Sequence, residues 1–139
     1  MTVNLVLITH DDIGTSLMKA ATMTFGELPL PTTSVAVSYE TDPEDLTPRL
    51  QQLAKTMTAN CGVLVLTDLF GSTPCNIAQG LQDVANVRVI SGLNLPMMIR
   101  VLNYPNLSLD ELADKAISGG KEGIMACECD NHPQKVAAV

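Results

Sequence analysis

Aromatic side chains are nearly absent from this chain, which has no Trp, two Phe and two Tyr among 139 residues. The hydrophobic fraction is nevertheless 46%, so aliphatic side chains and seven Met must fill the interior. That fraction is enough for a packed core and argues against disorder. The length allows one domain and hardly two. An aliphatic core of this kind favours helices packed on a parallel sheet over a β-sandwich.

Basic residues are also few. Eight Lys and Arg stand against fifteen Asp and Glu, which gives a formal net charge of −7. Nucleic-acid binding requires clustered cations, so the composition argues against DNA or RNA as a partner. An acidic surface suits a protein partner with a basic patch, because opposite charges speed the encounter.

Long apolar runs are missing as well, since no stretch approaches the roughly 20 residues that span a bilayer. The first residues, MTVNLVLITHDD, have no basic leader and no cleavage pattern, so we expect no signal peptide. We expect a soluble, cytoplasmic protein.

Four cysteines stand at positions 61, 75, 127 and 129 with uneven spacing, and reduced thiols are expected. Cys127 and Cys129, followed by His132, look like a fragment of a metal site. A tetrahedral site needs a fourth ligand and a fixed backbone, so we expect no metal. The sequence predicts one domain over residues 1–126 and a flexible tail over residues 127–139.

Apolar runs alternate with helical patterns along the domain. The pattern predicts strands at residues 3–8, 33–38, 61–66 and 86–90, and helices at residues 13–25, 43–60, 95–102 and 109–125. Another helix is expected to start with Thr73 as N-cap and Pro74 as its first residue. Alternation of this kind predicts a doubly wound α/β fold, with a mainly parallel sheet of four or five strands, helices on both faces and the flavodoxin-like order 2-1-3-4.

Sites in such sheets form beyond the carboxyl ends of the strands, where the strand order reverses. Here that point lies between the first and third strands. Three loops rich in Gly, Pro and polar residues reach this edge of the sheet: THDDIG, TDLFGSTPCN and SGLNLPMM. The sequence therefore predicts a functional site at this edge.

His10 ends the first predicted strand and is one of two histidines in the chain. A neutral imidazole can attack phosphorus and leave again near pH 7. Asp68, at the end of the third strand, is placed to accept the far ring N–H and to stabilise the charge that develops. A structural histidine and a turn-forming aspartate are the alternatives.

Gly71, Ser72 and Thr73 offer a flexible loop, two hydroxyls and the start of a helix, where free N–H groups favour anions. We predict that they hold the phosphoryl oxygens. Asp11 and Asp12 have the same sign of charge as a phosphoryl group, and capping of the first helix is one explanation for them. An apolar partner surface is expected around the site, formed by Leu69, Phe70, Leu95 and Met97.

The segments ITHDDIG, LTDLFGSTPCNIA and VISGLNLPMMI together resemble the enzyme IIA domain of the mannose family of the bacterial phosphoenolpyruvate-dependent sugar phosphotransferase system (PTS). The resemblance spans about residues 3–126 and implies a phosphotransferase component whose His10 accepts phosphate from the phosphocarrier HPr. The phosphoryl group then passes to a IIB partner. It further implies that Asp68 pairs with His10, that Ser72 and Thr73 lie in the phosphate loop, that no cofactor is needed, and that homodimers exchange an edge strand.

The chain departs from this family in carrying Asp11 and Asp12 after His10, where a Gly is often seen, and in ending without a IIB domain. We expect a free-standing IIA that either serves a separate permease or reports its phosphorylation state to a regulatory protein. Phosphotransfer is the expectation common to both.

Other functions remain open, among them a plain ligand-binding or interaction domain. A phosphoaspartate receiver would bind magnesium through oxygen ligands. It would use Asp11 and Asp12 after the first strand, Asp68 after the third and Ser91 after the fourth. A receiver also needs a lysine after a fifth strand, whereas Lys115 and Lys121 lie in or beside the last predicted helix. The phosphotransfer subunit of dihydroxyacetone kinase shares the fold, but the SGLNLPMM loop fits the mannose type better.

Overall fold

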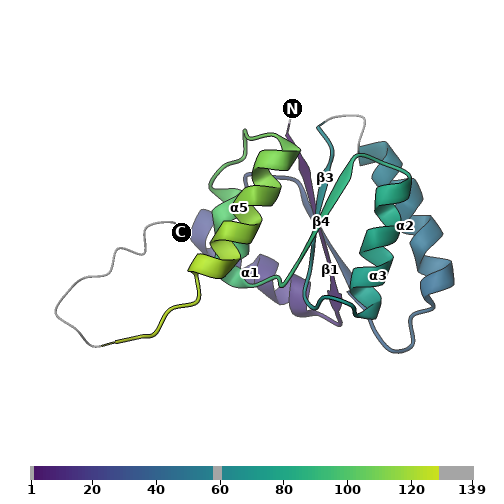
Figure 1. Ribbon diagram of the computed structural model, residues 1–139, viewed down its shortest axis with the longest axis horizontal. Helices are drawn as coiled ribbons and strands as arrows, with labels where there is room; N and C mark the ends of the chain where they lie inside the picture. The colour runs from purple at the N-terminus through teal and green to yellow at the C-terminus, as the bar shows by residue number, and fades with distance from the viewer. Residues whose placement is uncertain (1, 58–60, 129–139) are drawn as a thin grey trace.

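The computed structural model describes residues 2–57 and 61–128. One parallel sheet holds β1 (Asn4–His10), β2 (Thr32–Val37), β3 (Val63–Thr67) and β4 (Val87–Ser91), in the order β2-β1-β3-β4. One face is covered by α1 (Ile13–Phe25), α4 (Leu95–Leu102) and α5 (Leu109–Glu122), and the other by α2 (Pro43–Met57) and α3 (Thr73–Gly80) (Figure 1). A short 3-10 helix, η1 (Leu81–Asp83), follows α3. The predicted doubly wound fold and its strand order are confirmed.

Alternate side chains of the central strands pack on opposite faces of the sheet. Leu5 and Leu7 of β1 belong to the core beneath α1, α4 and α5, whereas Val6 and Ile8 belong to the core beneath α2 and α3. Because both faces are covered, residues 5–8 of β1 and 63–66 of β3 are unbroken apolar runs and show no polar alternation.

Several predicted boundaries shift in the structure. β1 continues to His10, which pairs with Val37 of β2, and β3 begins only at Val63, after Gly62 turns the chain with a φ of +97°. The prediction that Thr73 caps α3 is wrong, because Ser72 has the extended backbone of the N-cap position and Thr73 is already helical. α5 ends at Glu122, three residues before the predicted end.

α4 and α5 pack closely against each other. Asn94 caps α4 by accepting a hydrogen bond from the Met97 N–H at 2.9 Å, and its amide donates to the Gly120 carbonyl at 3.1 Å. The guanidinium of Arg100, which is nearly buried, donates to Glu122 Oε2 at 2.7 Å. These contacts fix the loop after β4 against α5.

No helix in the described ranges is long and apolar enough to cross a membrane. Residues 127 and 128, which begin the predicted tail, have no regular secondary structure. The rest of that tail and the predicted end of α2 at residues 58–60 lie outside the described residues.

Candidate functional site

The strand order reverses between β1 and β3, which are neighbours at the centre of the sheet. His10 is the last residue of β1, and Asp68 directly follows the last residue of β3. The parallel register pairs Ile8 with Thr67, so the two residues meet at the carboxyl edge although 58 positions separate them in sequence. The structure thus brings together the two side chains that the sequence singled out.

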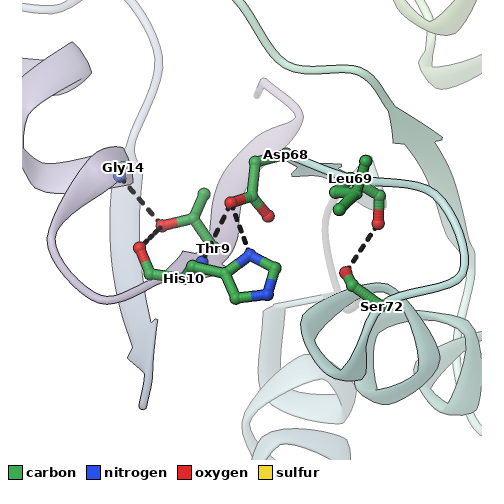
Figure 2. A network of polar contacts seen from close by, with 6 residues as sticks. All are labelled: Thr9, His10, Gly14, Asp68, Leu69 and Ser72. Carbon is green, nitrogen blue, oxygen red and sulfur yellow. Dashed lines mark hydrogen bonds and ion pairs between the residues drawn. The ribbon is translucent and has the colours of Figure 1, made fainter. Parts of the chain in front are cut away.

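A single oxygen of Asp68 makes two hydrogen bonds to His10. The ring Nδ1 lies 2.8 Å from Oδ2, and the backbone N–H of His10 donates to the same oxygen at 3.1 Å (Figure 2). A carboxylate only accepts hydrogen bonds, so the ring proton is on Nδ1. Nε2 therefore carries a free lone pair on the side of the ring away from Asp68.

Exposure differs sharply across this pair. The His10 side chain is 43% exposed, whereas that of Asp68 is 11% exposed. The second carboxylate oxygen, Oδ1, is buried and has no hydrogen-bond partner among the described residues. The aspartate is thus a fixed internal group, and the imidazole is open to a large reactant.

The turn after His10 is held by Thr9, a residue that sequence reasoning missed. Its buried hydroxyl accepts a hydrogen bond from the Gly14 N–H at 2.9 Å (Figure 2). A Cβ at Gly14 would lie 2.6 Å from Ser34 Oγ and 3.2 Å from Leu7 Cβ, so a side chain there would have to displace its neighbours. A hydroxyl residue in an otherwise aliphatic strand, next to the candidate nucleophile, was the available signal.

The loop predicted to hold phosphate lies between β3 and α3. Gly71 is exposed with a φ of +81°, Ser72 is half-buried, and Thr73 is exposed at the start of the helix. The Ser72 hydroxyl donates to the Leu69 carbonyl at 2.6 Å and makes no capping hydrogen bond (Figure 2). The N–H groups at the start of α3 therefore receive no acceptor from the N-cap side chain.

The predicted apolar surface is only partly at the surface. Leu69 and Phe70 are 61% and 75% exposed at the tip of the same loop. Leu95 is half-buried, but Met97 is 3% exposed, so its assignment to this surface was wrong. The Asn94 cap turns Met97 into the core, where it packs close to Gly120 of α5.

The capping explanation for the two acids after His10 holds for Asp12 by position alone. Asp12 occupies the N-cap position of α1 but its side chain makes no capping hydrogen bond, and both acids are exposed. Within the described ranges there is no group of three or more His, Cys, Asp or Glu that could hold a metal ion. Cys129 and His132, which with Cys127 suggested a metal-site fragment, lie outside those ranges.

The fold and this edge of the sheet define a doubly wound α/β domain with a histidine–aspartate pair at its switch point. The family model described as "PTS system fructose IIA component" (EIIA-man) matches residues 4–117. The chain belongs to this family, the mannose-type EIIA of the sugar phosphotransferase system, as the three sequence motifs predicted. Members are phosphotransferase components of sugar uptake.

Relatives and solved structures agree with this assignment. The "PTS system mannose-specific EIIAB component" of Escherichia coli K12 is 34% identical over 129 residues, which is 91% of this chain and 40% of the relative. The "PTS system fructose-specific EIIA component" of Bacillus subtilis is 25% identical over 96% of this chain and 91% of its own length. The mannose/sorbose-specific IIA subunit of Enterococcus faecalis superposes with a TM-score of 0.82 at 28% identity, covering 95% of this chain and 99% of that one. The chain thus spans less than half of the curated mannose relatives that it matches.

Proposed function

We propose that His10 is a phosphoryl carrier, which accepts the group from phospho-HPr and passes it to a IIB component or a regulatory protein. The observation that carries this proposal is the 2.8 Å contact between Nδ1 and Asp68, which leaves Nε2 as the accessible nucleophile. Family membership supports the same chemistry, because mannose-type EIIA relatives are PTS components.

In the accepting step, the Nε2 lone pair of neutral His10 attacks the phosphorus and forms a new N–P bond. The N–P bond of the donor breaks, and its electron pair returns to the donor ring, which leaves as neutral imidazole with the proton of its other nitrogen. His10 then carries both the phosphoryl group and its Nδ1 proton, so its ring is cationic. Asp68 stabilises this charge at hydrogen-bond distance, and the reverse step releases it.

Gly71, Ser72 and Thr73 are proposed to hold the phosphoryl oxygens. The start of α3 supplies N–H groups without a side-chain cap, and helix N-termini favour anions. For Ser72 to donate to phosphate, its hydroxyl must leave the Leu69 carbonyl, to which it now donates. The exposed Leu69 and Phe70 beside this loop give both partner proteins an apolar surface to bury.

The test is labelling with radioactive phosphoenolpyruvate, enzyme I and HPr, in the wild type, His10→Ala and Asp68→Asn. We expect an acid-labile, alkali-stable label that is absent from His10→Ala. In Asp68→Asn we expect the rate to fall by about tenfold or more, because the neutral amide no longer balances the ring charge. Asp83→Asn, an exposed change on η1, is the control and should behave as wild type.

Two outcomes would contradict the proposal. Label that survives His10→Ala and is lost in alkali would indicate an aspartyl phosphate and favour the receiver function. A wild-type protein that takes no label from phospho-HPr of its own organism would exclude the carrier function. Thermal unfolding of each variant establishes that a lost label reflects chemistry and not a lost fold.

A further inference from the structure

Asp11 has an unusual backbone for a residue with a side chain. Its φ is +43°, and it is the one non-glycine residue of the described ranges with a positive φ. Residues with a Cβ are strained in this left-handed conformation, which glycine adopts freely and Asp or Asn tolerates best. A carboxylate therefore stands directly beside His10 at a position where glycine would be less strained.

The position of this carboxylate is fixed by the sheet. The Asp11 N–H donates to the carbonyl of Val37, the last residue of β2, at 3.0 Å. The following residue, Asp12, is already the N-cap position of α1. The strained turn is thus anchored at both ends and holds the Asp11 side chain exposed at the rim of the site.

Nothing within the described molecule uses the Asp11 carboxylate. It caps no helix, and it makes no hydrogen bond or ion pair with any described residue. The arginines of the described ranges pair with other acids: Arg49 with Asp45, Arg88 with Asp110 and Arg100 with Glu122. A strained, exposed carboxylate without an internal partner points to a partner outside the chain.

We propose that Asp11 determines partner specificity by pairing with a Lys or Arg that the phosphoryl-donor protein presents beside its own phosphorylated side chain. This inference rests on the proposed carrier function. A donor must bring its phosphorus to Nε2 of His10, so the donor surface around the phosphoryl group has to cover the adjacent residue. A donor without a cation there would leave Asp11 repelling the phosphoryl group, whereas a basic donor removes that repulsion and gains an ion pair.

The experiment measures the second-order rate constant for phosphoryl transfer from phospho-HPr at low and high salt. The proteins compared are wild type, Asp11→Asn, Asp11→Gly and the remote control Asp83→Asn, which lies at the opposite edge of the sheet. Asp11→Asn removes the charge but keeps a residue that tolerates the left-handed backbone. Asp11→Gly removes the charge and the strain together.

Both Asp11 variants should slow transfer at low salt by about two- to fivefold, the range of one ion pair at a surface. Their rate constants should also depend less on salt than that of the wild type. The transfer rate at saturating donor should not change, because Asp11 acts on encounter and docking. Only Asp11→Gly should shift thermal stability, and Asp83→Asn should match the wild type in transfer.

Three outcomes would overturn the inference. One is an Asp11→Asn protein whose rate and salt dependence equal those of the wild type. Another is an unchanged encounter rate with a longer-lived phosphohistidine, which would mean that Asp11 acts on the bound phosphoryl group. The third is slow transfer in Asp11→Gly alone, which would assign the effect to the backbone. Failure of the carrier function itself is distinguishable, because the wild type would then take no label.

Discussion

Two buried threonines next to the site differ in whether their hydroxyl makes a hydrogen bond, and this difference decides how much each hydroxyl stabilises the fold. Thr9 and Thr67 are both fully buried, at the ends of β1 and β3. The Thr9 hydroxyl accepts the Gly14 N–H, whereas the Thr67 hydroxyl has no hydrogen-bond partner among the described residues. An isosteric change to Val therefore removes a used hydroxyl in one case and an unused one in the other.

We predict that Thr9→Val destabilises the protein by about 1–3 kcal/mol, because the buried Gly14 N–H loses its acceptor. Thr67→Val should leave the free energy of unfolding unchanged or raise it, because it removes a buried hydroxyl that makes no hydrogen bond. Urea denaturation of the two variants provides the comparison. Equal losses in both would show that the Thr9 hydrogen bond has no special weight.

At the residue scale, the sequence predicted the His10–Asp68 pair because both residues end predicted strands that are neighbours in a doubly wound sheet. The sequence did not predict the backbone of Asp11, since left-handed turns at non-glycine residues follow from tertiary anchoring, here by Val37. The N-cap error at Thr73 has a similar cause. Ser72 and Thr73 are equally good N-caps by type, and the path of the loop chooses between them.

At the scale of elements, glycines of α5 allow this helix to pack closely on α4. A Cβ at Gly119 would overlap Cβ and Cγ of Arg100, which are close to the α4 backbone and have little freedom to move. Gly119→Ala gains about 1 kcal/mol in helix propensity but loses about 1–3 kcal/mol to overpacking. We predict a net loss of stability, measured by thermal unfolding. The matched control is Lys121→Ala on an exposed position of the same helix, and a Gly119→Ala protein as stable as that control would contradict the prediction.

The start of α5 has a helix cap whose contribution to stability depends on pH. Ser108 and Glu111 form a capping box, in which the Ser108 N–H donates to Glu111 Oε1 at 3.2 Å and the Glu111 N–H donates to Ser108 Oγ at 3.3 Å. The hydrogen bond from the Ser108 backbone, then its side chain and the charge of Lys115, hold the pKa of Glu111 below its ordinary value of 4.5. The ionised form of Glu111 therefore stabilises the folded state.

We predict that wild type is more stable than Glu111→Gln above pH 4.5, and that this advantage shrinks as the pH falls through the lowered pKa. Gln keeps an acceptor for the box but has no charge to lose. Urea midpoints over a pH series measure the difference, with Asp114→Asn on the exposed face of α5 as the control. An advantage that stays constant or grows in acid would show that the charge of Glu111 plays no part.

At the scale of the whole molecule, periodicity and alternation were enough to predict the class of fold, its strand order and most of its elements. They could not predict how deeply each apolar side chain is buried. Met97 has the same apolar character as Phe70, yet one is buried beneath α5 and the other is 75% exposed at a loop tip. Only the packing of α4 on α5 separates them, and that packing depends on glycines whose close contacts cannot be read from spacing.

The two hydrogen bonds from His10 to one oxygen of Asp68 have a consequence for the direction of the proposed phosphoryl transfer. Because that oxygen holds both the main chain and the ring of His10, the torsion of the imidazole is set before any partner arrives. Under the proposed carrier function, transfer from a given partner and its reversal pass through the same transition state, so a preset nucleophile assists both directions of each transfer equally. Such a carrier imposes no preference of its own, and the net flow through it follows the relative phosphoryl potentials of the proteins on either side.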